Sequence, residues 1–223
     1  MDDICRNLSL EELLKNYSNN SGAWYWIGMA YMGRGDYSNA AEWLEKTKND
    51  SGDHGWQGKA TLNLGIINRS FLNPPNKQKA LALFNSIPSF ALAKLHAGAM
   101  YSKGEGVDRN PGKGVQLINE AIACIVELKG NDNFFAANEC FEIAEVYRDN
   151  GLASKAVEYF KKTIARCNTS YASDRNLKEW AESNIQNGGS TACPSCGGQT
   201  NAHERGGRWC ENSQCSKYHK VYF

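Results

Sequence analysis

The stretch WYWIGMAYMGRGDYSNAAEWL, residues 24–44, decides the fold of this chain. It contains two apolar segments separated by a turn rich in Gly and Asp, with Gly28 in the first segment and Ala40 in the second. Apolar residues three and four positions apart indicate helices, and a small residue on each helix lets the two backbones approach closely. The stretch therefore predicts a hairpin of two helices.

The same pattern recurs three more times along the chain. A small residue beside an apolar one begins each recurrence, at Leu64-Gly65, Ala97-Gly98 and Ile143-Ala144. A break and a second amphipathic segment follow each of them, and these segments begin near Ala80, Gly114 and Ala156. One hairpin cannot cover its own apolar face, but several stacked hairpins can. We therefore predict an all-α fold, a right-handed α-solenoid of about four helix hairpins.

These residues carry a resemblance to a known family. The first hairpin resembles the tetratricopeptide repeat at Trp24, Ile27, Gly28, Tyr31, Gly35, Tyr37, Ala40 and Leu44, and the fourth resembles it at Cys140, Ile143, Ala144, Tyr147, Gly151, Ala156 and Phe160. The third resembles the related Sel-one-like repeat, with its longer turn, at Gly98, Tyr101, Gly104, Glu105, Gly106, Val107, Asn110 and Lys113. The second is the weakest match.

Both ends of the repeat region carry a further predicted helix. Ser9 and Glu12 form a capping box, which predicts a short helix over residues 10–17. A last helix with Trp180 on its apolar stripe ends before Gly188 and closes the array. We therefore predict a helical domain over residues 1–189 and a second, small domain over residues 190–223.

Four cysteines crowd into the second domain: Cys193, Cys196, Cys210 and Cys215. Two closely spaced pairs can place four thiolates around one cation, and Zn²⁺ favours this tetrahedral sulfur shell. The segment resembles a small β zinc ribbon and predicts one structural zinc ion. The other four cysteines lie singly in helical sequence, where a cysteine behaves as a small apolar residue.

The sequence leaves other chemistries open for this cluster. Iron also accepts four thiolates, and His203 or His219 could replace one sulfur ligand. A disulfide is disfavoured because the first residues show no secretory signal, so that we expect a cytoplasmic, reducing compartment. A redox pair is disfavoured because Pro194 and the glycines after Cys196 do not begin a helix.

The tetratricopeptide resemblance implies a concave groove lined by the first helix of each hairpin. The implied lining residues are Tyr25, Met29, Met32, Leu62, Ile66, Arg69, Leu95, Phe141, Glu145 and Arg148. This lining is apolar and rich in adaptable side chains, so we expect a helix or peptide of a protein partner to bind there. The alternative is that the N-terminal helix fills the groove itself.

Composition narrows the classes of function. The 223 residues carry 25 Lys and Arg against 24 Asp and Glu, which excludes a uniformly basic nucleic-acid-binding protein. No segment is long and apolar enough to span a membrane, and no motif of an enzyme is present, so we expect neither catalysis nor a small-molecule substrate. The charge is uneven, because residues 59–113 carry a basic excess and residues 120–149 an acidic one.

We therefore expect a protein-interaction scaffold or adaptor. By analogy with bacterial Sel-one-like proteins, its role would be that of a regulator or of a protein that neutralises an effector or toxin. The alternative is a regulator that contacts DNA or RNA through the ribbon, where Arg205 and Arg208 accompany Trp209 and Tyr218.

Overall fold

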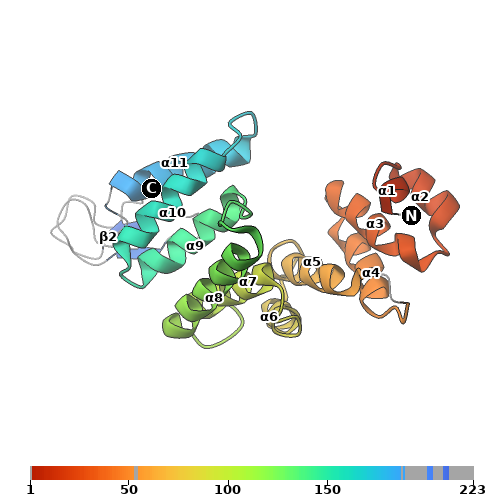
Figure 1. The fold of residues 1–223 in the computed structure, drawn as a ribbon, viewed down its shortest axis with the longest axis horizontal. Coiled ribbons are helices and arrows are strands. Elements are labelled where there is room, and N and C mark those ends of the chain that lie inside the picture. The colour runs from red at the N-terminus through yellow and green to blue at the C-terminus, as the bar shows by residue number, and fades with distance from the viewer. Residues whose placement is uncertain (1, 53–54, 187, 189–199, 203–207, 211–223) are drawn as a thin grey trace. The chain divides into compact units, whose positions relative to one another are not determined.

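The structure is a computed structural model that describes residues 2–52, 55–186, 188, 200–202 and 208–210. The described residues form α-helices and one short β-hairpin (Figure 1). The helices are α1 (Asp2–Cys5), α2 (Leu10–Tyr17), α3 (Ser21–Gly33), α4 (Tyr37–Lys48), α5 (Gln57–Ser70), α6 (Lys77–Asn85), α7 (Ala91–Lys103), α8 (Pro111–Lys129), α9 (Ala137–Asp149), α10 (Ala153–Arg166) and α11 (Ala172–Gln186). The strands are β1 (Thr200–Ala202) and β2 (Arg208–Cys210). The predicted all-α character is confirmed.

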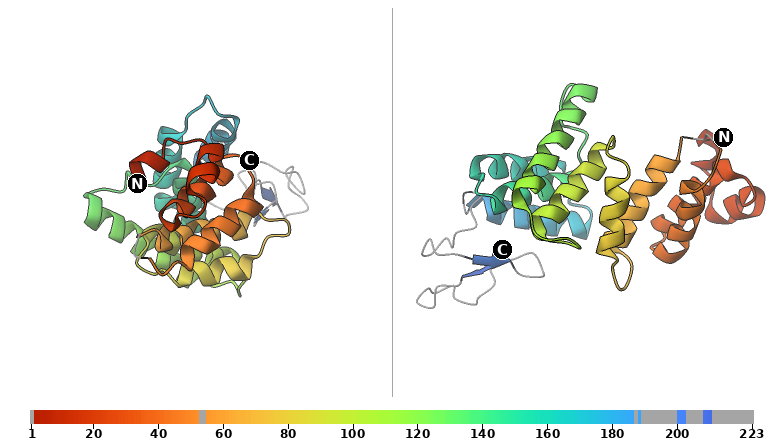
Figure 2. Two further views of the ribbon diagram at one scale, coloured as in Figure 1. Left: turned by 90° about the vertical axis from the view of Figure 1, so that its right-hand side faces the viewer. Right: turned by 90° about the horizontal axis from the view of Figure 1, so that it is seen from below.

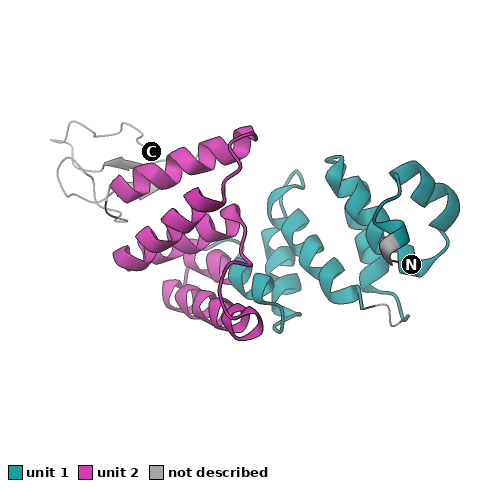
Figure 3. Ribbon diagram, turned by 45° about the horizontal axis from the view of Figure 1, so that its top comes forward, with its two compact units in different colours: residues 1–97, 105–108 teal, residues 98–104, 109–223 magenta. Residues whose placement is uncertain are grey.

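The chain divides into two compact units (Figure 3). Unit 1 contains residues 1–97 and 105–108, and unit 2 contains residues 98–104 and 109–223. The division falls within α7. The helical domain over residues 1–189 stays a prediction. Most of the predicted second domain, residues 190–223, lies outside the described residues.

Helix pairs form within each unit as predicted. In unit 1, α3 packs on α4 and α5 packs on α6, and in unit 2, α9 packs on α10. The small residues explain the close approach: a Cβ added to Gly28 would lie 2.8 Å from the Leu44 side chain, and one added to Gly98 would lie 2.9 Å from the Gly114 carbonyl oxygen. These contacts leave no room for a side chain at either glycine.

The second helix of three hairpins begins in the same way. Asp36, Asn76 and Asn110 are the N-cap residues of α4, α6 and α8, and each side chain accepts the backbone N–H three residues later. This bond satisfies one of the N–H groups that have no partner within the helix. In α8, Pro111 follows the cap at the position where its missing N–H does no harm.

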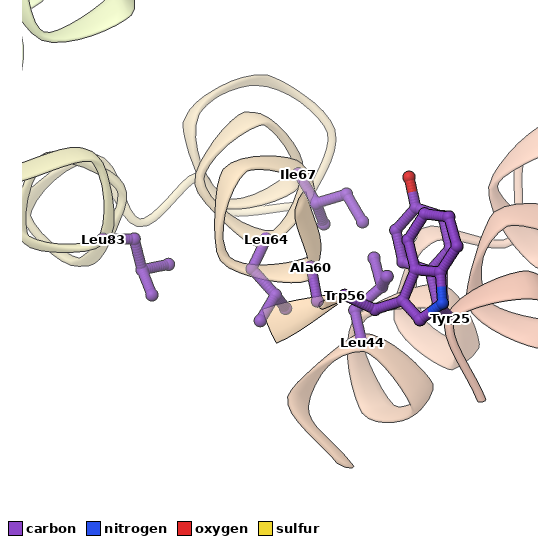
Figure 4. Close-up of a cluster of buried hydrophobic side chains, with 8 residues drawn as sticks. Tyr25, Leu44, Trp56, Ala60, Leu64, Ile67 and Leu83 are labelled. Carbon is purple, nitrogen blue, oxygen red and sulfur yellow. The ribbon is translucent and has the colours of Figure 1, made fainter. Parts of the chain in front are cut away.

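The core of unit 1 joins three successive hairpin helices. Figure 4 shows Tyr25 of α3, Leu44 of α4 and Leu64 of α5 converging with Trp56, which directly precedes α5. A second cluster packs the N-terminal segment on α3, where Leu10 and Leu13 are buried with Ala23 and Ile27. The predicted helix over residues 10–17 is confirmed, including its capping box.

Unit 2 is built around α9. Its buried face includes Ile143, Ala144 and Tyr147, and it packs against α10 and α11. The 19-residue helix α8 extends past its neighbours in this unit (Figure 2), and its last residues, 126–129, are exposed.

Candidate partner-binding surface

The predicted groove residues of α3 contact the following first helix, α5. The Tyr25 ring stacks on Trp56, with 4.6 Å between centroids and 12° between planes. The Asn63 Nδ2 group of α5 donates to the Tyr25 hydroxyl at 3.3 Å and to Met29 Sδ at 3.2 Å. Burial raises the pKa of Tyr25, which is 8% exposed. This side of α3 is thus used largely in packing, with Met29 and Met32 half-buried.

The N-terminal helix lies on the other side of α3. Its residues Leu10 and Leu13 pack against Ala23 and Ile27. At about 100° per residue, Ala23 and Ile27 project roughly opposite to Tyr25. The predicted alternative, that this helix covers the groove side of α3, is therefore wrong: α2 covers the opposite side.

Arg69 of α5 is held by an ion pair within unit 1. Its Nε donates to Glu105 at 2.9 Å, and its Nη1 lies 3.2 Å from His96 Nδ1 of α7. Glu105 belongs to the long turn that follows α7, and the Arg69 side chain is only 10% exposed. Glu105 therefore already neutralises Arg69, the predicted cation of the groove. The two residues lie 36 positions apart in the sequence, and no sequence pattern indicated this ion pair.

In unit 2, the predicted groove residues Glu145 and Arg148 form a buried charge network. Arg148 donates to Glu145 at 3.2 Å, to Asp149 at 2.9 Å and to the Asn184 side chain of α11 at 2.7 Å. Lys103 donates to Glu145 at 2.8 Å. Although burial opposes both charges, Asp149 and Glu145 hold the pKa of Arg148 above its ordinary value. Likewise, against the effect of burial, Lys103 and Arg148 hold the pKa of Glu145 below its ordinary value.

The last helix, α11, also covers Phe141, the aromatic residue among the predicted groove residues of unit 2. The Phe141 ring of α9 lies 6.3 Å from the Trp180 ring of α11 and 5.5 Å from Phe160 of α10. Phe141 is 9% exposed as a result. The contact from Phe141 to Trp180 repeats the relation between Tyr25 and Trp56, because in both cases an aromatic residue after the hairpin packs on its first helix.

Half of the predicted lining is therefore buried within the units. Tyr25, Leu62, Leu95, Phe141 and Arg148 are at most 9% exposed. The half-buried members are Met29, Met32, Ile66, Arg69 and Glu145. The physical reason is that residues following each hairpin cover its first helix: Trp56 packs on Tyr25 in unit 1, and α11 contacts Phe141 and Arg148 in unit 2. A partner on this side would contact the half-buried members.

Of the four predicted zinc ligands, only Cys210 belongs to a described element. Cys193, Cys196 and Cys215 lie outside the described residues, whereas Cys210 ends β2. The strands pair antiparallel, with Thr200 opposite Cys210 and Ala202 opposite Arg208. Within the described part of the chain, no three His, Cys, Asp or Glu residues form a cluster that could hold a metal ion.

The comparisons with known proteins identify one of the repeats. Residues 21–46 match the tetratricopeptide repeat family, which confirms the predicted resemblance at the first hairpin. No curated protein matches the chain. No helix among the described residues is both long and apolar enough to cross a bilayer.

Two kinds of solved structure are similar to the chain. The crystal structure of MamA is 25% identical, with a TM-score of 0.44, and the match covers 70% of this chain and 84% of that one. The crystal structure of a Sel1 repeat protein from Oxalobacter formigenes is 17% identical, with a TM-score of 0.45, and the match covers 81% of this chain and 70% of that one.

Proposed function

We propose that this protein is a scaffold or adaptor that binds a protein partner through its helix hairpins. The observation that carries the proposal is the tetratricopeptide repeat at residues 21–46, together with the packed hairpins of both units. Stacked helix hairpins present extended surfaces that suit macromolecular partners. The proposal includes a role without catalysis. It also includes a cytoplasmic location, because the zinc site proposed below requires reduced cysteine thiols. A role as a bacterial regulator, or in neutralising an effector or toxin, is a narrower form of the same proposal.

Affinity capture from a lysate of the source organism tests the scaffold role. Met32→Glu places a charge on a half-buried residue of the α3 surface, whereas Leu128→Glu makes the same type of change at a position that is 69% exposed on α8. We expect the wild type and Leu128→Glu to retain the same partner and Met32→Glu to lose it, while circular dichroism shows equal helicity. Absence of any stoichiometric partner on the wild-type bait would contradict the proposal.

We also propose that Cys193, Cys196, Cys210 and Cys215 bind one structural zinc ion. The support is their spacing and the antiparallel pairing of β1 with β2, because the chain that enters the first strand of a hairpin and the chain that leaves the second lie at the same end. The first cysteine pair precedes β1, and the second pair begins at the last residue of β2. Bound zinc would supply folding free energy to a segment too short for a core of its own.

Metal analysis tests this second proposal. We expect one zinc per chain in the wild type, none in Cys196→Ser, and an unchanged helical signal in both. Cys124→Ser, in helix α8, is the matched control and should keep the metal. Iron in place of zinc, or zinc retained by Cys196→Ser, would show the assignment to be wrong.

A further inference from the structure

Basic and acidic residues are unevenly distributed along the chain. Residues 54–104 contain six Lys and Arg and no Asp or Glu. In the acidic part, by contrast, Glu145 and Asp149 are paired with Arg148, and Asp132 accepts from Lys162 at 2.5 Å. These three carboxylates are therefore used within the fold. The basic segment, by contrast, has exposed lysines that an outside partner could contact.

Two lysines at the start of α6 carry this excess on the surface of unit 1. The Lys77 side chain makes no ion pair or hydrogen bond with any described residue, and the Lys79 ammonium approaches only Glu45, at 4.0 Å. Both residues are exposed. Glu105, the acid beside Gly106 in the chain, is held by Arg69 and does not neutralise them.

A shallow cavity of about 390 Å³ lies beside Lys77, within unit 1, and Lys79 lies two residues further along α6. Its walls are formed by Pro74, Pro75, Asn76, Lys77 and Gln78, with Gly106 at one side. The proline rings supply an apolar wall, and Lys77 and Gln78 supply hydrogen-bond donors. This volume is at the small end of the range of about 300–1,000 Å³ for ligand pockets, which suits a few side chains of a partner.

We propose that this cavity is the docking site for an acidic segment of the protein partner. Carboxylates of the segment would pair with Lys77 and Lys79, while its aliphatic carbons pack on Pro74 and Pro75. Opposite charges across an interface steer association and select the partner. The inference rests on the proposed scaffold function and adds the chemistry of the partner to it.

The lining favours an acidic protein segment over a nucleic acid. Sequence-independent binding of single strands combines a basic groove with aromatic side chains on which the bases stack. The cavity is lined by prolines and polar side chains and contains no aromatic residue. A short acidic peptide needs only the cations and the apolar wall that this site provides.

Binding of defined probes to the full chain tests the proposal. The probes are a fluorescein-labelled peptide of alternating glutamate and alanine, its glutamine counterpart, and a thymidine oligonucleotide, each measured by anisotropy at low and high salt. We expect the glutamate peptide to bind at low salt and to weaken as salt rises, because salt screens exposed charges over about 10 Å at 0.1 M. The glutamine peptide should not bind.

Charge reversal locates the site. Lys77→Glu combined with Lys79→Glu should weaken glutamate-peptide binding by about tenfold or more, since each reversal turns an attraction into a repulsion. Lys129→Glu combined with Lys161→Glu makes the same change in net charge at two exposed positions of unit 2 and should leave binding nearly unchanged. Lys77→Gln combined with Lys79→Gln gives a milder version of the test should the reversed pair fold poorly.

Four results would overturn the inference. Glutamate-peptide binding could weaken equally in the unit 2 control, or could stay unchanged in both lysine variants of α6. The glutamine peptide could bind as well as the glutamate peptide, or the oligonucleotide could bind more tightly than the glutamate peptide and lose this binding in the α6 variants. The last result would assign the site to nucleic acid. If the native partner is captured equally by wild type and by the α6 variants, this docking site is wrong and the scaffold function stands. If the wild type captures no partner, the scaffold function fails independently of the peptide result.

Discussion

Arg148 of α9 donates from Nη1 to the Asn184 side-chain oxygen of α11 at 2.7 Å, while its side chain is only 4% exposed. The same guanidinium pairs with Glu145 and Asp149. One buried cation therefore pairs with two carboxylates and at the same time attaches the last helix to the preceding hairpin.

Replacing this arginine should destabilise unit 2. Arg148→Ala leaves the Glu145 and Asp149 carboxylates without their common cation in a mostly buried site, and breaking a buried pair in this way costs about 3 kcal/mol or more. We expect a matching decrease in the urea unfolding free energy. Lys161→Ala, an exposed position on α10, is the control and should change stability little. Equal stability of Arg148→Ala and wild type would contradict the assigned role.

Acid should weaken the same network. The pKa of Glu145 in the folded state lies below its ordinary value of 4.5, because Lys103 and Arg148 outweigh the effect of burial. Its contribution to stability is therefore complete above that ordinary value and is lost as the pH falls through the lower, folded-state value. We expect the stability difference between wild type and Glu145→Gln to be largest near neutral pH and to shrink in acid. A stability difference between the two proteins that grows in acid would contradict this role of Glu145.

Gly106 should tolerate no side chain. Its φ is +71°, and an added Cβ would lie 2.7 Å from the Lys77 carbonyl carbon. Both the left-handed backbone and the clash oppose Gly106→Ala, so we expect a loss of about 1–3 kcal/mol in chemical denaturation. Gly33→Ala is the matched control, because Gly33 lies in α3 with open space around it. That change should be neutral or stabilising by up to about 1 kcal/mol.

Cys140 should be unreactive in the folded protein. Burial raises the pKa of its thiol to about 11, and the side chain is fully enclosed. Since the thiolate is the reactive form, native Cys140 should resist iodoacetamide at neutral pH, while half-buried Cys124 reacts faster. Mass spectrometry of the two peptides measures both rates. After unfolding, the two cysteines should react alike, and equal rates before unfolding would contradict the buried position.

The sequence predicts the helix pairs well because the relevant signals are local. Gly28 with Ala40, and Ser9 with Glu12, are close enough in the chain for periodicity and capping to define their helices. The groove lining is less predictable. Periodicity shows that Tyr25 and Phe141 lie on an apolar side of a helix, but the residues that cover them, Trp56 and Trp180, lie beyond the hairpin to which each belongs.

Charge was the least predictable property. Counting residues reveals an acidic segment around α9, but it cannot show that Arg148 and Lys103 already neutralise Glu145. Pairs of this kind join residues on different helices, and their geometry depends on how those helices pack. The same counting correctly identified the basic excess, and the structure then located the two exposed lysines of α6 within it.

The ion pair between Arg69 and Glu105 limits how the repeats can be exchanged in protein engineering. Replacing the long turn after α7 with the shorter turn of an ordinary tetratricopeptide repeat would remove Glu105. Arg69 of α5, whose side chain is only 10% exposed, would then lose this carboxylate. A transplanted third repeat must therefore bring a carboxylate of the same reach or be accompanied by a neutral residue at position 69. The hairpins of this protein are not interchangeable modules, because at least one of them carries the counter-charge of another.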